Sequence, residues 1–147
     1  MNITINQATT PSDMESCHNI RRRVFIEGQN VPEEDEIDGL DGESNRYLLK
    51  LDNSPAGTAR IRYVEGKAKI ERVAILSGHQ GKGLGRKLMQ YLLQEIVRAG
   101  KAKTAILGAQ THAIPFYEDL GFTVCSDEYM DAGILHKDMQ ISFKNTQ

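Results

Sequence analysis

The spacing of hydrophobic residues changes along the chain, and each spacing predicts an element. Ile3 and Ile5 alternate with polar residues, which indicates a short strand. From Ser12 to Phe25 the apolar residues recur at helical spacing, so we expect a helix with one buried face. Ser12 and Glu15 fit a capping box at its start, with Ser12 as the N-cap.

Strand spacing returns in the middle of the chain. Apolar runs separated by turn residues predict three consecutive antiparallel strands, at residues 47–51, 56–64 and 67–76. A glycine-rich turn follows, and beyond it the pattern is helical from Gly83 to Ala99. Two adjacent apolar rows mark this helix as amphipathic, and Gly100 is its predicted C-cap.

The last third of the chain mixes both kinds of element. Residues 104–107 predict a buried strand, which a right-handed crossover would place parallel to the strand before the helix. Further elements are predicted as a short helix at residues 113–120 and closing strands at residues 122–124 and 134–141. This mixture indicates an α/β (α+β) fold in a single domain, residues 1–147. Residues 144–147 are expected to fray.

The glycine-rich turn has the composition of an anion site. Gly81, Gly83 and Gly85 allow backbone N–H groups to approach a ligand closely, and the following helix directs the positive end of its dipole to the same place. Lys82 and Arg86 add positive charge. Two common phosphate motifs do not fit, because the turn lacks both the Gly-Lys-Ser/Thr of a P-loop and the glycine order of a dinucleotide fingerprint.

The turn does match Gln/Arg-x-x-Gly-x-Gly/Ala, filled by Gln80, Gly83 and Gly85, and this resembles the acyl-CoA signature of the GNAT family of N-acetyltransferases. Downstream, Ala113 to Phe122 is similar to the A-x-x-F-Y-x-x-x-G-F segment of that family. The resemblance implies the GNAT fold, with a central mixed twisted sheet of about six to seven strands flanked by about four helices. It also implies an enzyme that transfers an acetyl group from acetyl-CoA, with no metal, to the amine of a small molecule by direct attack on the thioester.

The resemblance also assigns cofactor contacts. In the family the glycine turn holds the CoA pyrophosphate, a role that falls here on Gln80, Gly81, Lys82, Gly83, Leu84, Gly85 and Arg86. The pantetheine arm pairs like a strand with the preceding strand, here Val73, Ala74 and Ile75. Phe116 is a further expected contact, and Gln110 stands where the family often has an asparagine.

Acyl transfer to an amine also needs a proton donor for the leaving thiolate and a base for the amine. Tyr117 matches the family's tyrosine donor, and the alternative is an ordinary core aromatic. Glu71 lies on a strand from which several GNAT enzymes draw a base, and burial would raise its pKa toward neutrality. Glu71 can equally face solvent and pair with Lys69 or Arg62. His136 is the competing base, although a lone histidine on a closing strand is often structural.

Other polar segments offer alternatives rather than a site. His79 and His112 are expected in turns, and no metal-ligand spacing is present in the sequence. Three consecutive arginines, residues 21–23, fan around a helix and are expected to be solvated or ion-paired rather than to contact a ligand. The acidic segment, residues 28–43, is either a solvated loop or short helix, or a rim that attracts a cationic amine. The stretch that leads into it, Val-Phe-Ile-x-x-Gln-x-Val-Pro at residues 24–32 followed by Glu and Asp, is similar to a bacterial GNAT subfamily of small uncharacterised acetyltransferases.

The composition of the chain limits the kinds of partner that we expect it to bind. With 18 basic and 20 acidic side chains and a net charge of −2, the chain has no overall field that favours nucleic acid or an anionic membrane. Neither a membrane-spanning apolar run nor a signal-peptide pattern is present, so we expect a cytoplasmic monomer or homodimer with reduced cysteines. Two functions stay open: the enzyme, and a CoA-binding sensor or interaction module without turnover.

Overall fold

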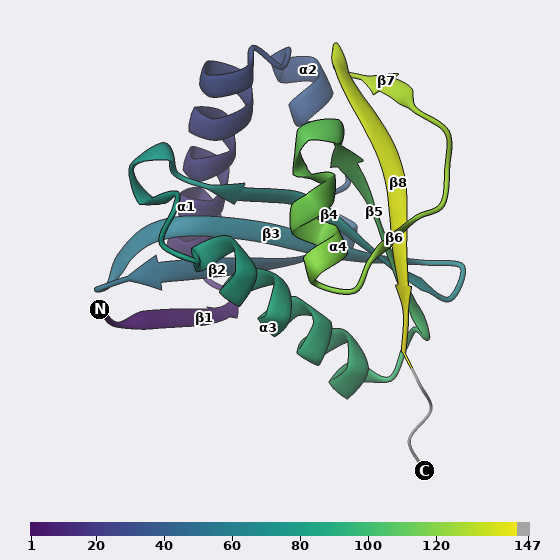
Figure 1. The fold of residues 1–147 in the computed structure, drawn as a ribbon. Helices are drawn as coiled ribbons and strands as arrows, with labels where there is room; N and C mark the ends of the chain where they lie inside the picture. Colours follow the sequence, from purple (N-terminus) through teal and green to yellow (C-terminus); the bar gives the residue numbers. More distant parts are fainter. Residues whose placement is uncertain (144–147) are drawn as a thin grey trace.

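A computed structural model describes residues 1–143, and residues 144–147, where fraying is expected, lie outside this part. Within residues 1–143, eight strands form one sheet in the order β1-β2-β3-β4-β5-β8-β6, with β7 paired to β8 (Figure 1). Strands β4 and β5 are parallel, and the other described pairs are antiparallel. The α/β (α+β) class is therefore confirmed. The sheet exceeds the expected six to seven strands because the three-residue strand β7 is too short to show a period.

The first half of the sheet is an antiparallel meander. Its strands are β1 (Ile3–Gln7), β2 (Asn45–Leu51), β3 (Ser54–Val64) and β4 (Lys67–Ile75). The hairpin between β3 and β4 turns at Glu65 and Gly66, whose φ angles of 51° and 77° are those of a tight left-handed turn. The three strands predicted for the middle of the chain are confirmed.

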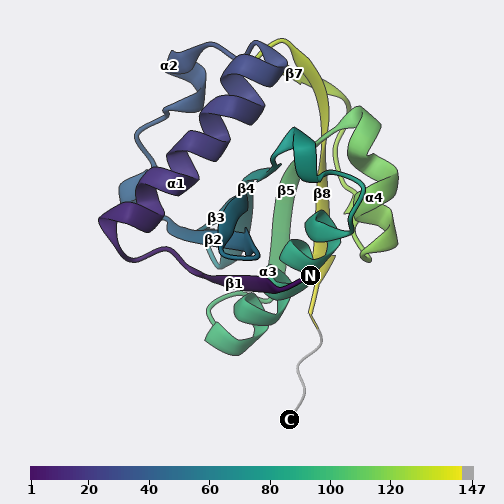
Figure 2. The ribbon, with the colours of Figure 1, turned by 90° about the vertical axis from the view of Figure 1, so that its left-hand side faces the viewer.

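Helices cover both faces of this meander. Because side chains alternate along β2, Leu48 joins the cluster under α1 (Pro11–Arg21), while Leu49 joins the larger cluster under α3 (Leu84–Ala99). Figure 2 shows α1 on one side of the strands and α3 and α4 on the other. The long helix ends at Gly100, whose φ of 67° confirms it as the C-cap.

Both ends of the first helix differ from the prediction. The hydroxyl of Thr10 accepts a 3.1 Å hydrogen bond from the N–H of Asp13, so Thr10 is the N-cap and Pro11 takes the first helical position. Ser12 lies inside the helix, and the predicted capping box is wrong. At its far end α1 passes into a π-helical turn, η1 (Arg22–Glu27), a rare geometry that is frequent at functional sites.

Apart from three short elements, the remaining elements follow the predicted order. After α1 and η1 the acidic segment forms the short helices α2 (Glu33–Glu36) and η2 (Asp41–Glu43), and η3 (Ser77–His79) precedes the glycine-rich turn. Strand β5 lies parallel to β4, as the crossover predicted. The second half of the sheet and its helix are β5 (Thr104–Gln110), η4 (Thr111–Ala113), α4 (Ile114–Asp119), β6 (Thr123–Val124), β7 (Tyr129–Asp131) and β8 (Ile134–Ser142). The strand β7 and the short helices η3 and η4 were not predicted.

Strands β4 and β5 part from each other soon after they begin. Their ladder pairs only Lys67–Lys69 with Thr104–Ile106. Beyond these residues each strand continues without a partner across the seam, so the backbone of residues 70–75 faces a gap rather than β5. This wedge between two parallel strands is where the fold opens.

A bulge bends β4 beside the wedge. Thr58 pairs with Ala74 but Arg60 pairs with Glu71, so two residues of β4, at positions 72 and 73, oppose one residue of β3. Arg72 has a φ of 56°, a left-handed conformation that costs a residue with a side chain about 1–3 kcal/mol unless its surroundings impose it. No pattern of hydrophobic or turn residues indicated this bulge.

Candidate active site

A cavity of about 910 Å³ fills the wedge between β4 and β5. Ligand pockets commonly measure about 300–1,000 Å³, so this cavity has room for a long ligand. It extends from the glycine-rich turn past α4 to the first residues of β8. The cavity brings together nearly all the predicted site residues, namely Glu71, Val73, Ala74, Ile75, Gln80, Gly81, Gly83, Leu84, Gly85, Arg86, Gln110, Phe116 and Tyr117. The exception is Lys82, which is exposed beside the cavity and does not line it.

The glycine-rich turn forms one end of the cavity. Gly81 and Gly83 have φ angles of 81° and 76°, and a Cβ at either position would meet nothing within 4 Å, so the space above the turn is open to a ligand. Gly83 is the N-cap of α3 and supplies no side chain to bond the first N–H groups of the helix. Lys82 and Arg86 are exposed, and neither forms an ion pair within residues 1–143. Unpaired N–H groups and cations thus converge on the same open space.

Tyr117 reaches the cavity from α4. Its ring packs edge to face against Phe116 and Phe122, with ring centroids 5.0 Å and 6.0 Å apart. Burial raises the pKa of Tyr117 to about 12, so the phenol keeps its proton at neutral pH. Phe116 is 37% exposed, and its ring lies 3.5 Å from the place of a Cβ on Gly85. Tyr117 is therefore both a packed aromatic and a lining residue, so the two predicted roles do not exclude each other.

Glu71 lines the cavity but is held by two arginines. Its carboxylate accepts hydrogen bonds of 3.1 Å and 3.3 Å from Arg62 and of 3.2 Å from Arg60. Burial acts to raise the pKa of Glu71, but the hydrogen bond from Arg62 and the charges of both arginines outweigh it and lower the pKa. The expected rise toward neutrality is wrong, and pairing with Arg62, the alternative, is what the structure contains.

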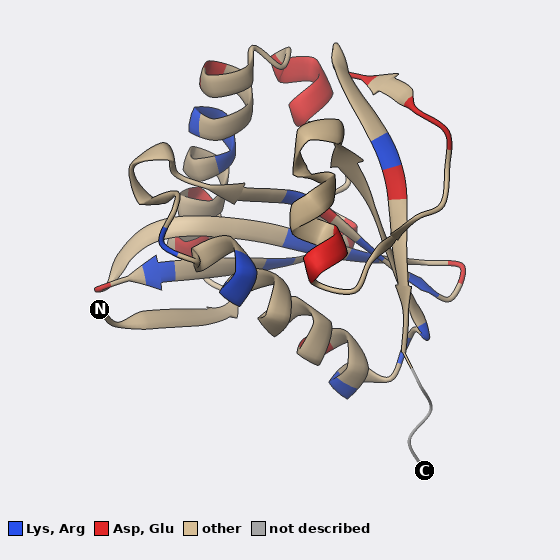
Figure 3. Ribbon diagram, in the orientation of Figure 1, with Lys and Arg blue, Asp and Glu red and all other residues tan. Residues whose placement is uncertain are grey.

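The acidic segment pairs with arginines inside the fold. Arg21 is 2% exposed and bonds Glu36 at 3.0 Å and Asp41 at 2.6 Å. Arg60 is 1% exposed and bonds Asp38 and Asp41. Figure 3 shows that α2 consists of acidic residues. The solvated-connector prediction is wrong for these carboxylates, whereas the expected ion-paired role is confirmed for Arg21.

The same ion network fixes the bulge of β4. Arg72 places its Nε 2.8 Å from a carboxylate oxygen of Glu36, and its NH2 group donates to Asp38 at 3.2 Å and to the carbonyl oxygen of Asp35 at 3.1 Å. These contacts impose the left-handed backbone of Arg72, which lines the cavity. The acidic segment therefore shapes the wall of the wedge.

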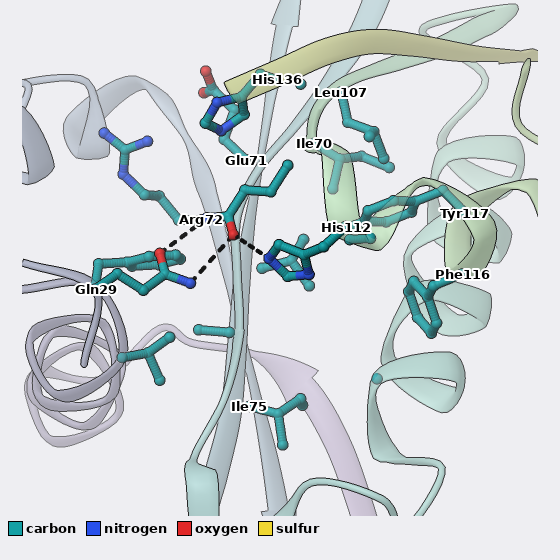
Figure 4. A pocket seen from close by; sticks show the side chains of 18 of the residues that line it. Gln29, Ile70, Glu71, Arg72, Ile75, Leu107, His112, Phe116, Tyr117 and His136 are labelled. Carbon is teal, nitrogen blue, oxygen red and sulfur yellow. Dashed lines mark hydrogen bonds between the residues drawn. The ribbon is translucent and has the colours of Figure 1, made fainter. Parts of the chain in front are cut away.

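Two glutamines and a histidine join opposite walls of the cavity. The Gln110 amide donates to the Gln29 carbonyl oxygen at 2.9 Å, and the Nε2 of His112 donates to the Gln110 carbonyl oxygen at 2.8 Å. Figure 4 shows Gln29 and His112 on opposite sides of the cavity, with the hydrogen bonds drawn between them. Gln29 follows η1, so the π-helical turn carries a polar side chain into the site.

A second polar group lies at the β8 end of the cavity. His136 stacks against Tyr129, with ring centroids 5.8 Å apart and 18° between the planes. The Tyr129 hydroxyl donates a 2.6 Å hydrogen bond to Asp138. All three side chains line the cavity.

The structure also bears on metals and membranes. No three His, Cys, Asp or Glu side chains within residues 1–143 are grouped so that they could hold a metal ion. None of the helices in that part of the chain is both long and apolar enough to cross a membrane.

The fold is shared with N-acyltransferases of known structure. An acyl-CoA N-acyltransferase from Pseudomonas aeruginosa superposes with a TM-score of 0.84 at 28% identity, over 95% of this chain and 97% of that one. A Bacillus subtilis acetyltransferase solved in complex with CoA shares the fold alone, with a TM-score of 0.77 at 15% identity, over 97% of this chain and all of that one (100%).

Sequence comparison defines the family. The acetyltransferase (GNAT) domain profile matches residues 15–143. The chain is 38% identical over 133 residues to YjcF of Bacillus subtilis, an uncharacterized N-acetyltransferase, and this stretch covers 90% of this chain and 94% of YjcF. The chain belongs to the GNAT family of acetyltransferases.

Several residues that line the cavity were not predicted from the sequence. Gln29 lay within the segment that resembles a GNAT subfamily, but nothing in the segment indicated that its side chain faces the site. His112 was placed in a turn, which is correct, yet the turn borders the cavity. Tyr129 had one usable signal: Gly108 directly follows the strand predicted at residues 104–107, and a glycine in a strand often marks a close approach. A Cβ on Gly108 would lie 2.6 Å from the Tyr129 hydroxyl.

Proposed function

We propose that this protein is an acetyl-CoA-dependent N-acetyltransferase that acetylates the amine of a small molecule. The observation that carries the proposal is the continuity of two features, an open anion cradle at the start of α3 and the wedge between β4 and β5. A pyrophosphate with a long flexible arm needs both. Membership of the GNAT family and the CoA complex of the Bacillus subtilis acetyltransferase support the choice of CoA.

The cradle suits the pyrophosphate. The backbone N–H groups from Gly81 to Arg86 lie at the positive end of a helix, next to the open space at Gly81 and Gly83, and a phosphate group is stabilised at such a place without a special motif. A side chain at Gly81 or Gly83 would project into that space, which explains why glycine suits both positions. Lys82 and Arg86 supply unpaired cations at the rim, whereas Gln80 donates to the carbonyl oxygen of Ile75 and stabilises the turn.

The wedge suits the pantetheine arm. Beyond Lys69 the edge of β4 that faces β5 has no strand partner, so Val73 to Ile75 can bond an extended ligand as an added strand. The amide of Gln110 lies on the opposite wall. Alignment of this kind makes the reaction effectively intramolecular and contributes up to about 7–11 kcal/mol to lowering the barrier.

The chemistry then needs few groups from the chain. When bound, acetyl-CoA supplies the acyl thioester and its thiol leaving group. Tyr117 holds a proton at neutral pH and serves as the donor to the sulfur as the C–S bond breaks. Glu71 is ionised and bonded to two arginines, so we assign it to positioning β4 rather than to proton abstraction.

A screen of amines that monitors thiol release from acetyl-CoA tests the function, and Tyr117→Phe tests the mechanism. This change removes one hydroxyl and keeps the packing on Phe116 and Phe122. The kcat should fall about 10²–10⁴-fold, or about 3–5 kcal/mol, while the dissociation constant of acetyl-CoA changes little. Binding of acetyl-CoA without thiol release for any amine would favour the non-catalytic sensor or interaction module instead.

A further inference from the structure

We infer that His136 is the general base that accepts the proton of the attacking amine, and that Tyr129 and Asp138 position its ring. This role rests on the proposed function, because it belongs to the acceptor end of the same cavity. It assigns the removal of the amine proton to a residue of the β7–β8 hairpin, whereas the sequence suggested Glu71 as the first candidate for this base.

The hydrogen bonds of His136 fix which nitrogen can accept a proton. Its Nδ1 lies 2.7 Å from the carbonyl oxygen of Ile134, and a carbonyl can only accept, so Nδ1 carries the hydrogen. In the neutral ring the other nitrogen, Nε2, then holds a lone pair. Within residues 1–143 this Nε2 has no hydrogen-bond partner, and the residue lines the cavity. An imidazole in this tautomer, facing a ligand space, is arranged to take up a proton.

One face of the His136 ring is covered by Tyr129, whose own position is fixed by a hydrogen bond. Tyr129 pairs with His136 across the β7–β8 ladder and stacks on its ring. The Tyr129 hydroxyl is in turn bonded to Asp138, which lies two residues along the same face of β8. The missing side chain of Gly108 leaves the space that the Tyr129 hydroxyl occupies. Tyr129 and Asp138 are therefore positioning residues.

The surroundings distinguish His136 from Glu71. The carboxylate of Glu71 is occupied by Arg60 and Arg62, and their charges lower its basicity. A base held that far below neutral pH gives little driving force for accepting a proton from an amine. Figure 4 shows His136 at the β8 side of the cavity and Tyr117 beside α4, so an acyl group between them has a donor and an acceptor on separate sides.

Other charged or titratable groups share this part of the cavity with His136. They come from every element packed around it, and they are Tyr129 and Asp131 of β7, Asp138 of β8, Glu71 and Arg72 of β4, Asp35 and Glu36 of α2, and His112 of η4. Arg72 is paired with Glu36 and Asp38, whereas Asp131 has no ion pair within residues 1–143. The test must therefore separate His136 from these neighbours by substitution.

The proton transfers balance with these groups alone. The amine nitrogen forms a bond to the acyl carbon and loses one proton to Nε2 of His136. The C–S bond breaks, its electron pair stays on sulfur, and the sulfur takes the proton of the Tyr117 hydroxyl. Transfer of one proton through water from His136 to Tyr117 restores both side chains. The products are the acetylated amine and the CoA thiol.

The first test compares wild type with His136→Gln, using hydroxylamine as the probe amine and subtracting the uncatalysed reaction. General-base catalysis predicts that kcat/KM for hydroxylamine falls about 10²-fold or more. Equal rates for the two proteins, including the absence of catalysis by either protein, would overturn the role.

The second test needs no turnover. Nitrogen NMR of the histidine side chains reports which ring nitrogen is protonated, and His136→Gln identifies the resonance. We expect hydrogen on Nδ1 and a lone pair on Nε2, in the presence and absence of acetyl-CoA. A hydrogen on Nε2 at neutral pH would contradict the assignment.

Matched variants separate catalysis from folding. His18→Gln removes a histidine on α1 that contacts Arg46 and Asp41 outside the cavity, and it should leave kcat/KM as in wild type. Tyr129→Phe keeps the stacked ring and loses the bond to Asp138, so kcat should fall several-fold with little change in the KM for acetyl-CoA or in the melting temperature. A Tyr129→Phe effect on stability alone would refute the positioning role.

One further measurement keeps this role distinct from the function itself. Acetyl-CoA binding is measured on the same preparations of wild type and His136→Gln. If both proteins bind acetyl-CoA and their rates are equal, His136 is not the base and the cofactor assignment survives. If wild type does not bind acetyl-CoA, the proposed function fails, and the role of His136 fails with it.

Discussion

The glycine-rich turn and the acidic segment are both dense in polar groups, yet they use them in opposite ways. Lys82 and Arg86 at the turn have no ion-pair partner within residues 1–143, and the N–H groups beside them have no side-chain cap. In the acidic segment, Glu36 and Asp41 form ion pairs with buried arginines. Charge that is already paired inside a fold builds structure, and charge that lacks a partner is available to a ligand.

The difference also explains how one region supports the other. The acidic segment holds Arg72 in a left-handed conformation, and this residue lies in the bulge that bends β4 beside the wedge. The turn at the end of β4 is thereby presented to the cavity. A buried ion pair contributes uncertain net stability, but loss of one partner is costly, so the network fixes this geometry more than it strengthens the fold.

The largest expected effect follows from removing a buried cation. Arg60→Met leaves Asp38, Asp41 and Glu71 without the guanidinium that bonds all three. The free energy of unfolding, measured by urea denaturation, should fall by about 3–5 kcal/mol. Lys82→Met makes the same chemical change at the turn, and it should alter stability by no more than about 0.5 kcal/mol. Equal losses from the two substitutions would abolish the distinction between paired and unpaired charge.

A somewhat smaller effect is expected on binding at the turn. Gly83→Val adds a branched side chain to the open space where we place the pyrophosphate, so the dissociation constant of CoA should rise about 100-fold or more, near 2.8 kcal/mol. Gly66→Val is a matched control, because Gly66 has a φ of 77° and an equally open Cβ position in the hairpin far from the cavity. Both variants should lose similar stability, and CoA affinity retained by Gly83→Val would show that the turn is only structural.

The smallest effect is expected at the exposed edge of the acidic segment. Glu33 pairs with Arg22 at 2.8 Å, but the Glu33 side chain is 57% exposed and the Arg22 side chain is 50% exposed. Glu33→Gln should change the free energy of unfolding by about 1 kcal/mol at most, because solvent screens such a pair. A loss comparable to that of Arg60→Met would mean that burial does not set the strength of these pairs.

Local patterns predicted most of the fold. The meander, the amphipathic helix with Gly100 as its C-cap, and the parallel strand after it were all readable from hydrophobic spacing and turn residues. The glycine turn was readable too, because its residues act through nearby backbone. The N-cap is Thr10 rather than Ser12 because Pro11 takes the first helical position. This proline was a local signal, but the prediction gave more weight to the capping-box pattern.

Long-range pairing set the limit of prediction. The partner of Arg60 is Asp38, and the partner of Arg21 is Glu36, and no spacing rule links such positions. The lowered pKa of Glu71 comes from its own pairs with Arg62 and Arg60, and the sequence offered the pair with Arg62 only as an alternative to a catalytic base. His136 was visible as a residue, but its tautomer and its contact with Tyr129 depend on how β7 pairs with β8.

The most direct measurement of the central claim is stabilisation of the protein by ligands that share a pyrophosphate. Acetyl-CoA occupies both the cradle and the wedge, whereas NAD offers the pyrophosphate without a pantetheine arm. Acetyl-CoA at 100 times its dissociation constant should stabilise the native state by about 2.7 kcal/mol, seen as a rise in melting temperature, and NAD should do much less. Equal stabilisation by NAD, or none by millimolar acetyl-CoA, would contradict the account.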